Sequence, residues 1–268
     1  MTDKFKKLEK WFEEYTGRFQ SRDTKIQVNF DLKILHTKKV LENAEALCLD
    51  LQINAEDIFI TRAAALLHDV GRFEQFNKYR TFVDKHSADH AELGLQILDD
   101  EAPLAELPDN ITNYIRLAIQ HHNKLEVPDH LDNQAKFFTR LLRDADKLDI
   151  FRVVTEYYEQ QKSGHQNEAI VLGLPDNQHY SDHVIEDILN HRIVKSQDLK
   201  TINDFKLLQM AWIFDINFVA ALNRVHERKY LERIYESLPK DDKINRAYAI
   251  INEFVADNCK KDLKARLW

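Results

Sequence analysis

The chain has 268 residues, of which 44% are hydrophobic and 31% charged, a composition typical of a globular protein with a sizeable core. Glycine and proline number only five each, which favours long helices over sandwiches, barrels and doubly wound folds, because those need many turn residues. The formal net charge is −7 and no long basic run occurs, so no nucleic-acid partner is expected.

The sequence also carries no sign of a secreted or membrane protein. The two cysteines, Cys48 and Cys259, do not make a disulfide framework. No N-terminal stretch resembles a signal peptide, and no apolar run approaches the length of a membrane span. We therefore expect a cytoplasmic protein without a membrane partner; the sequence does not predict its oligomeric state.

The first predicted helices lead to a His–Asp pair. Residues 1–20 form an amphipathic helix, and a second helix from about residue 31 places His36 on its apolar face. A third helix begins at Asn54, a favourable N-cap residue, and is apolar on most sides, so it should be central. It brings His68 and Asp69 into the interior, where a carboxylate is costly unless it is paired or binds a metal.

The residues after this pair predict a change of direction. Gly71 can adopt the left-handed conformation that ends a helix, so we expect the helix to stop there. Residues 72–85 are polar and aromatic and are predicted to form a loop over the His68–Asp69 end.

Three later helices carry further residues that can bind metals. A helix near residues 87–99 presents His90 and, four residues on, Gly94, which would let another backbone come close. A helix that begins at residue 109 or 110 ends in the pair His121 and His122. A long helix over residues 132–159 places Asp146 among aliphatic residues; Asp144 is the alternative inward carboxylate.

Taken in order, these residues resemble the HD-domain superfamily of metal-dependent phosphohydrolases. The matching pattern is an early His (His36), the His68–Asp69 pair and a later Asp (Asp146), which the resemblance implies bind one divalent metal. His90 and the pair His121–His122 resemble the extra ligands of subfamilies that hold two metals, where Asp69 would bridge the ions. No Gly-Tyr-Pro follows the His pair, so the cyclic-dinucleotide-specific branch is not supported.

The resemblance also implies a fold and a domain plan. We expect an all-α helical bundle of HD-domain type with an additional C-terminal helical subdomain. The HD-type metal-binding domain would cover residues 1–159, with its core at 30–155. Residues 160–190 would be a loop or lid, and residues 191–268 would be helices packed on the same domain, with one strongly apolar helix over residues 204–225.

The expected reaction is hydrolysis of a nucleotide or another small phosphate ester by metal-activated water. One or two divalent ions would be needed, and N/O ligands of this kind accept Mn, Fe, Ni, Co, Zn or Mg. Asp69 and Arg72 are the expected catalytic residues, Arg72 as the cation that meets the phosphate, with Arg143 and Lys147 as weaker alternatives. His90 or His121 could protonate the leaving group. An HD-type di-iron oxygenase and a non-catalytic nucleotide-binding sensor are the alternative functions.

Overall fold

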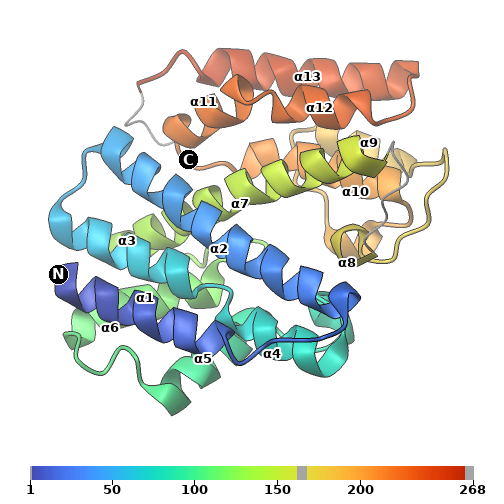
Figure 1. The fold of residues 1–268 in the computed structure, drawn as a ribbon. Coiled ribbons are helices and arrows are strands. Elements are labelled where there is room, and N and C mark those ends of the chain that lie inside the picture. Colours follow the sequence, from blue (N-terminus) through green and yellow to red (C-terminus); the bar gives the residue numbers. More distant parts are fainter. Residues whose placement is uncertain (1, 162–167, 263–268) are drawn as a thin grey trace. The chain divides into compact units, whose positions relative to one another are not determined.

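The computed structural model describes residues 2–161 and 168–262 and is built from helices (Figure 1). No β-strand occurs in these two ranges, which confirms the all-α prediction. The chain divides into two compact units, residues 1–149 and 150–268, and the division falls within one long helix. The predicted lid at residues 160–190 stays a prediction, and residues 162–167 of it lie outside the described residues. None of the described helices is long and apolar enough to cross a membrane.

The first unit is arranged around α3. Its elements are α1 (Thr2–Thr16), α2 (Thr24–Leu51), α3 (Ala55–Leu67), α4 (Val70–Tyr79), the 3-10 turn η1 (Asp84–His86), α5 (His90–Glu101), α6 (Asp109–His121) and the first part of α7 (Asn133–Gln161). Helix α3 packs against α1, α2 and α6, which confirms its central place. The side chain of Asn54 caps it by accepting hydrogen bonds from the backbone N–H groups of Glu56 and Asp57, both at 2.9 Å.

A helix occupies most of the segment that the sequence predicts as a loop. Helix α4 forms because Phe73 is fully buried and anchors it in the core of the unit. The Phe73 ring lies against an aromatic cluster at centroid distances of 5.7–6.4 Å, consisting of Phe12, Tyr15, Phe19 and Phe30. These partners come from distant parts of the chain, so local composition did not reveal the helix.

The prediction for Gly71 is also wrong, and the reason is a close helix contact. Helix α3 already ends at Leu67, and Gly71 lies inside α4 without a positive φ. A Cβ at Gly71 would lie 2.1 Å from the His90 carbonyl oxygen and 2.6 Å from the Gly94 backbone nitrogen. Glycine is therefore required where α4 meets α5, and the expectation that Gly94 admits another backbone is confirmed.

The second unit contains the last part of α7 and a set of shorter helices. These are α8 (Glu168–Val171), α9 (Asp182–Leu189), η2 (Ser196–Asp198), α10 (Ile202–Ala211), η3 (Trp212–Asp215), α11 (Val219–Glu227), α12 (Tyr230–Glu236) and α13 (Asp242–Asn258). The single helix predicted over residues 204–225 is broken between η3 and α11. There the Asn217 side chain donates to the Asp215 carbonyl at 3.1 Å, an acceptor that a continuous helix would use for its own backbone.

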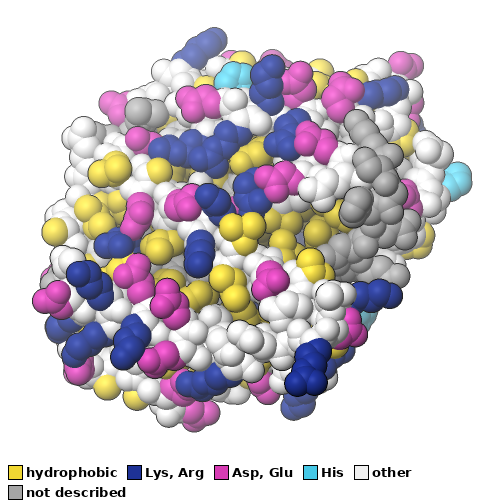
Figure 2. Space-filling view, viewed as in Figure 1, with side chains coloured by type: hydrophobic (Ala, Val, Ile, Leu, Met, Phe, Trp, Pro, Cys, Tyr) yellow, Lys and Arg dark blue, Asp and Glu magenta, His cyan; other side chains and the backbone are white. Residues whose placement is uncertain are grey.

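Charged side chains of both signs are interspersed on the face drawn in Figure 2. This agrees with the lack of a long basic run in the sequence. Within the first unit, α2, the α3–α4 turn, α5, α6 and α7 supply the side chains described next.

Candidate metal centre

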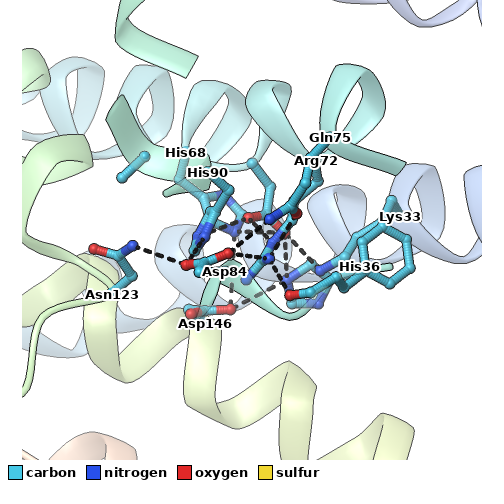
Figure 3. A network of polar contacts seen from close by, with 12 residues as sticks. Lys33, His36, His68, Arg72, Gln75, Asp84, His90, Asn123 and Asp146 are labelled. Carbon is cyan, nitrogen blue, oxygen red and sulfur yellow. Dashed lines mark hydrogen bonds and ion pairs between the residues drawn. The ribbon is translucent and has the colours of Figure 1, made fainter. Parts of the chain in front are cut away.

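His68 and Asp69 lie in the turn between α3 and α4, in the interior of the first unit (Figure 3). His68 is fully buried and Asp69 is 3% exposed. The ring nitrogen Nδ1 of His68 lies 2.8 Å from the Ala65 carbonyl oxygen, while its Nε2 is buried without a hydrogen-bond partner. An orphaned buried nitrogen of this kind is costly in a folded chain and points to a missing ligand.

His36 and Asp146 face this turn from α2 and α7. His36 Nε2 lies 3.1 Å from Asp146 Oδ1 and 3.5 Å from Asp69 Oδ2. His68 Nε2 lies 3.6 Å from Asp69 Oδ2 and 3.8 Å from Asp146 Oδ1. Ligand atoms of His36, His68 and Asp146 all fall within 4.8 Å of one another, close enough to share one metal ion. We call these three residues the His36 half of the centre.

His90 and His122 approach Asp69 from its other side, and we call them the His90 half. His90 Nε2 lies 3.5 Å from Asp69 Oδ1 and 3.0 Å from His122 Nε2. Ligand atoms of His68, Asp69 and His122 form a second group within 4.8 Å. The two carboxylate oxygens of Asp69 therefore face different halves, the arrangement that a bridging ligand needs.

All four imidazoles are oriented in the same way, with Nδ1 turned outward onto an oxygen atom. His36 Nδ1 lies 2.7 Å from Asp149 Oδ2, and His90 Nδ1 lies 2.7 Å from Asp84 Oδ2. His122 Nδ1 lies 2.6 Å from the Ile119 carbonyl oxygen, and His68 Nδ1 faces the Ala65 carbonyl oxygen in the same way. Carbonyl and carboxylate oxygens only accept, so Nδ1 carries the proton and Nε2 is the nitrogen available to a metal.

The charges of the centre are strongly coupled. Burial alone would raise the pKa of the Asp69 carboxyl, but Lys33 and the neighbouring imidazoles hold it well below its usual value. Burial opposes ionisation of Asp146 too, yet its interaction with His36 keeps its pKa low. Burial, followed by His90 and His68, lowers the pKa of His122 to about 3. Burial and Lys33 oppose protonation of His36, yet its hydrogen bonds with Asp146 and Asp149 raise its pKa. The centre thus combines ionised carboxylates with imidazoles, the donor set that divalent first-row metals bind.

The pair of facing nitrogens is a further test of this fit. With both Nδ1 atoms protonated, neutral His90 and His122 would point two lone pairs at each other across 3.0 Å. Burial, and next to it Arg72, lowers the pKa of His90, which disfavours a proton between the rings. Two nitrogens that each lie about 2.1 Å from one ion, at right angles, are separated by about 3.0 Å. The residues present therefore fit a metal ion in the His90 half as well.

Two predicted site residues are placed differently. His121 is the last residue of α6, and its charged neighbours are Lys124, His130 and Glu92, so its ring lies outside the cluster. The Arg72 guanidinium is directed to Asp84: Nη1 donates to Asp84 Oδ1 at 2.8 Å and to the Phe82 carbonyl at 2.6 Å. Its Nε lies 3.5 Å from Asp69 Oδ1.

The other two basic candidates and the alternative acid can also be located. Arg143 is buried and donates to backbone carbonyl groups of the α6–α7 loop, including that of His122 at 3.2 Å. Lys147 is 8% exposed on α7. Asp144 is fully buried on the same helix, whereas Asp146 contacts the Nε2 atom of His36.

Three residues that matter to the centre were not assigned a role from the sequence. Lys33 donates from Nζ to Asp69 Oδ2 at 2.8 Å, and Asp149 and Asp84 hold His36 and His90. Lys33 precedes His36 by one helical turn, and Asp149 follows Asp146 by one turn, so helical spacing could have identified both. Asp84 lies in η1, outside any periodic segment, and the sequence offered no such signal for it.

Comparison with family models gives one match, to the HD domain, over residues 34–150. This range begins in α2 just before His36 and ends just after Asp149, so it contains every residue of both halves. Comparisons with curated proteins and with solved structures gave no match. The ordered His and Asp residues, the helical fold and the family match agree. Residues 34–150 of the chain therefore form an HD domain.

Proposed function

We propose that this protein is a metal-dependent phosphohydrolase that acts on a nucleotide or another small phosphate ester. HD domains are commonly metal-dependent hydrolases, which supports the reaction class. The observation that carries the proposal is the shared orientation of four buried imidazoles, each with Nδ1 on an oxygen atom. This leaves Nε2 for a metal, and the Nε2 atoms of His36 and His68 lie near both Asp69 and Asp146.

In this proposal two ions share Asp69. His36, His68, Asp69 and Asp146 would hold one ion, and Asp69, His90 and His122 would hold the other. Support for the second comes from the 3.0 Å separation of the Nε2 atoms of His90 and His122, which suits two nitrogens that bind one ion. His121 would not be a ligand, because its ring lies with Lys124, His130 and Glu92.

The chain's own residues would orient the centre and its substrate. When bound, divalent ions acidify water and polarise phosphoryl oxygens, which supplies a hydroxide nucleophile at neutral pH. Lys33 lies beside Asp69 with its side chain 16% exposed, so its ammonium group can reach a phosphate that binds there. Arg72 would act mainly by holding Asp84 and Asp69, since Nη1 already has three acceptors within 2.8 Å, the third being Gln75 Oε1. Fixed positive charge next to a transferring phosphoryl group stabilises the transition state.

Metal analysis followed by a phosphate-release screen tests the proposal. Protein purified without added metal is expected to carry close to two ions per chain and to release phosphate from a nucleotide or a small phosphate ester. Chelation should abolish the activity and one of the divalent metals should restore it. Asp69→Ala is expected to lose metal and activity together; phosphate release by metal-free Asp69→Ala protein would overturn the proposal.

The same preparations distinguish the two alternative functions. Oxygen consumption by iron-loaded protein with no phosphate release would identify an oxygenase. Tight nucleotide binding without turnover would identify a sensor.

A further inference from the structure

Asp89 lies directly before His90 and joins two separate segments of the first unit. It is the N-cap of α5: Oδ1 accepts from the backbone N–H of Ala91 at 3.0 Å and of Glu92 at 3.4 Å. The same Oδ1 accepts from Asn123 Nδ2 at 2.8 Å, and Oδ2 accepts from Lys124 Nζ. An N-cap needs only the contacts to its own helix, so the two additional contacts require another explanation.

Both additional partners directly follow His122. Asn123 and Lys124 begin the loop after α6, and Asn123 Nδ2 also lies 3.4 Å from Asp84 Oδ2, the oxygen that orients His90. Asp89, which directly precedes His90, is therefore hydrogen-bonded to the two residues that directly follow His122. We call Asp89, Asn123 and Lys124 the Asp89 clamp.

Arg143, on α7, holds the same loop through the loop's backbone. Its guanidinium donates to the carbonyl groups of His122 and Leu125, each at 3.2 Å, and to that of Lys124. Arg143 lies on α7 and Asp89 at the start of α5, so the loop is held between two helices. Asp89 is then a contact between this loop and the start of α5, directly before His90.

We propose that Asp89 is a positioning residue that sets the spacing of His90 and His122 and thereby the affinity of the His90 half for its metal ion. The inference rests on the proposed function, because it takes both halves to bind metal. It gives Asn123 and Lys124, which follow the His pair, a role in metal binding. It also predicts that the affinity for one ion can change without a change in the affinity for the other. Residues around metal ligands commonly change metal affinity by tenfold to a hundredfold when they are mutated.

Two variants break the clamp from opposite ends. Asn123→Ala removes the amide from the loop and leaves α5 unchanged. Asp89→Ser retains a side chain that can cap α5 but is too short to hold Asn123 and Lys124. Asp241→Ser is the matched control, because Asp241 is also an acidic N-cap, that of α13, far along the chain from the His90 half.

Titration of each metal-stripped full-length variant with Mn²⁺, followed by calorimetry, measures the two equivalents separately. The second equivalent is the ion of the His90 half. We expect its Kd to rise about tenfold to a hundredfold in Asn123→Ala and Asp89→Ser, with the Kd of the first equivalent unchanged. Asp241→Ser should match the wild type in both. Thermal unfolding identifies any loss that reflects instability, since a merely structural defect would weaken both equivalents together.

The outcomes separate this inference from the proposed function. A wild-type chain that binds two ions while both clamp variants also bind two with unchanged Kd would overturn the positioning role alone. Equal weakening of both equivalents would overturn it as well. A wild-type chain that binds fewer than two ions would overturn the two-ion centre itself, whatever the variants do.

Discussion

The two halves of the centre share Asp69 but are supported differently. The His36 half is held by interior groups: Asp149, which is 1% exposed, and the Ala65 carbonyl. The His90 half depends on carboxylates nearer to solvent, since the side chains of Asp84 and Asp89 are 31% and 34% exposed. Exposed ionic contacts are weakened by water and salt. We therefore expect the His36 half to bind its ion more tightly and the His90 half to be the more adjustable.

The largest effect should come from the residue that the halves share. Asp69→Asn replaces an ionised carboxylate that faces both halves, so we expect both metal equivalents to weaken and phosphate release to fall at least about a thousandfold. His122→Ala is the contrasting variant, because it removes a ligand from one half only. Metal analysis should find one retained ion in His122→Ala; loss of both ions there would mean that the halves do not bind independently.

A change at Gly71 should damage the contact between α4 and α5 that holds His90 in place. The Cβ of Gly71→Ala would meet the His90 carbonyl oxygen at 2.1 Å, so α5 must move and carry His90 with it. We expect the free energy of unfolding to fall by about 1–3 kcal/mol, the usual cost of overpacking, and the second metal equivalent to be lost first. Urea unfolding and metal analysis measure the two effects.

Gly94→Ala is the control for this change. Its Cβ would lie 3.3 Å from the Gly71 backbone nitrogen, a much milder contact. The higher helix propensity of alanine offsets part of the strain, so stability should stay within about 1 kcal/mol of the wild type. Equal stability of the Gly71→Ala and Gly94→Ala chains would show that the close approach of α4 and α5 is not required.

Removal of a carboxylate that accepts a hydrogen bond from a histidine Nδ1 should weaken metal binding in one half only. Asp149→Ala takes away the acceptor for His36 Nδ1, and Asp84→Ala takes away that for His90 Nδ1. Each is expected to weaken one metal equivalent by about tenfold to a hundredfold, the first for Asp149 and the second for Asp84. Calorimetric titration with Mn²⁺ checks the assignment, and a reversed pattern would contradict the difference between the halves.

The same difference explains what the sequence could predict. His36 and Asp146 lie on helices with an apolar stripe, and the His68–Asp69 pair directly follows an apolar helix, so the sequence pattern indicates that they point inward. The surroundings of the His90 half were harder to predict than His90 and His122 themselves, because Asp84 and the Asp89 clamp lie in turns and loops whose geometry depends on distant partners. His121 shows the limit: adjacent histidines at a helix end point in different directions, and only the packing of α6 decides which one turns inward.

Helix α4 and Gly71 show a similar limit. The polar residues of this segment suggested a loop, whereas Phe73 packs in an aromatic cluster drawn from α1, α2 and the connection between them. The role of Gly71 follows from the crossing of α4 and α5, and a left-handed turn was an equally reasonable expectation from sequence. Both cases depend on contacts between segments that no local pattern contains.

The smallest predicted effect tests whether Lys33 serves the substrate or the metal ligands. Lys33 Nζ lies 2.8 Å from Asp69 Oδ2 and 5.3 Å from the centre of the Phe82 ring, at the edge of the His36 half. If it faces the phosphate, Lys33→Met should lower kcat about tenfold and leave both metal equivalents in place, because a transition-state contact is lost while the ligands remain.

Lys38→Met changes an exposed lysine on the same helix; it is the control and should behave as the wild type. Lys33→Arg should restore much of the rate, since it keeps the positive charge. Loss of a metal equivalent in Lys33→Met would instead show that Lys33 acts by holding Asp69, and the His36 half would then depend on a partly exposed ion pair just as the His90 half does.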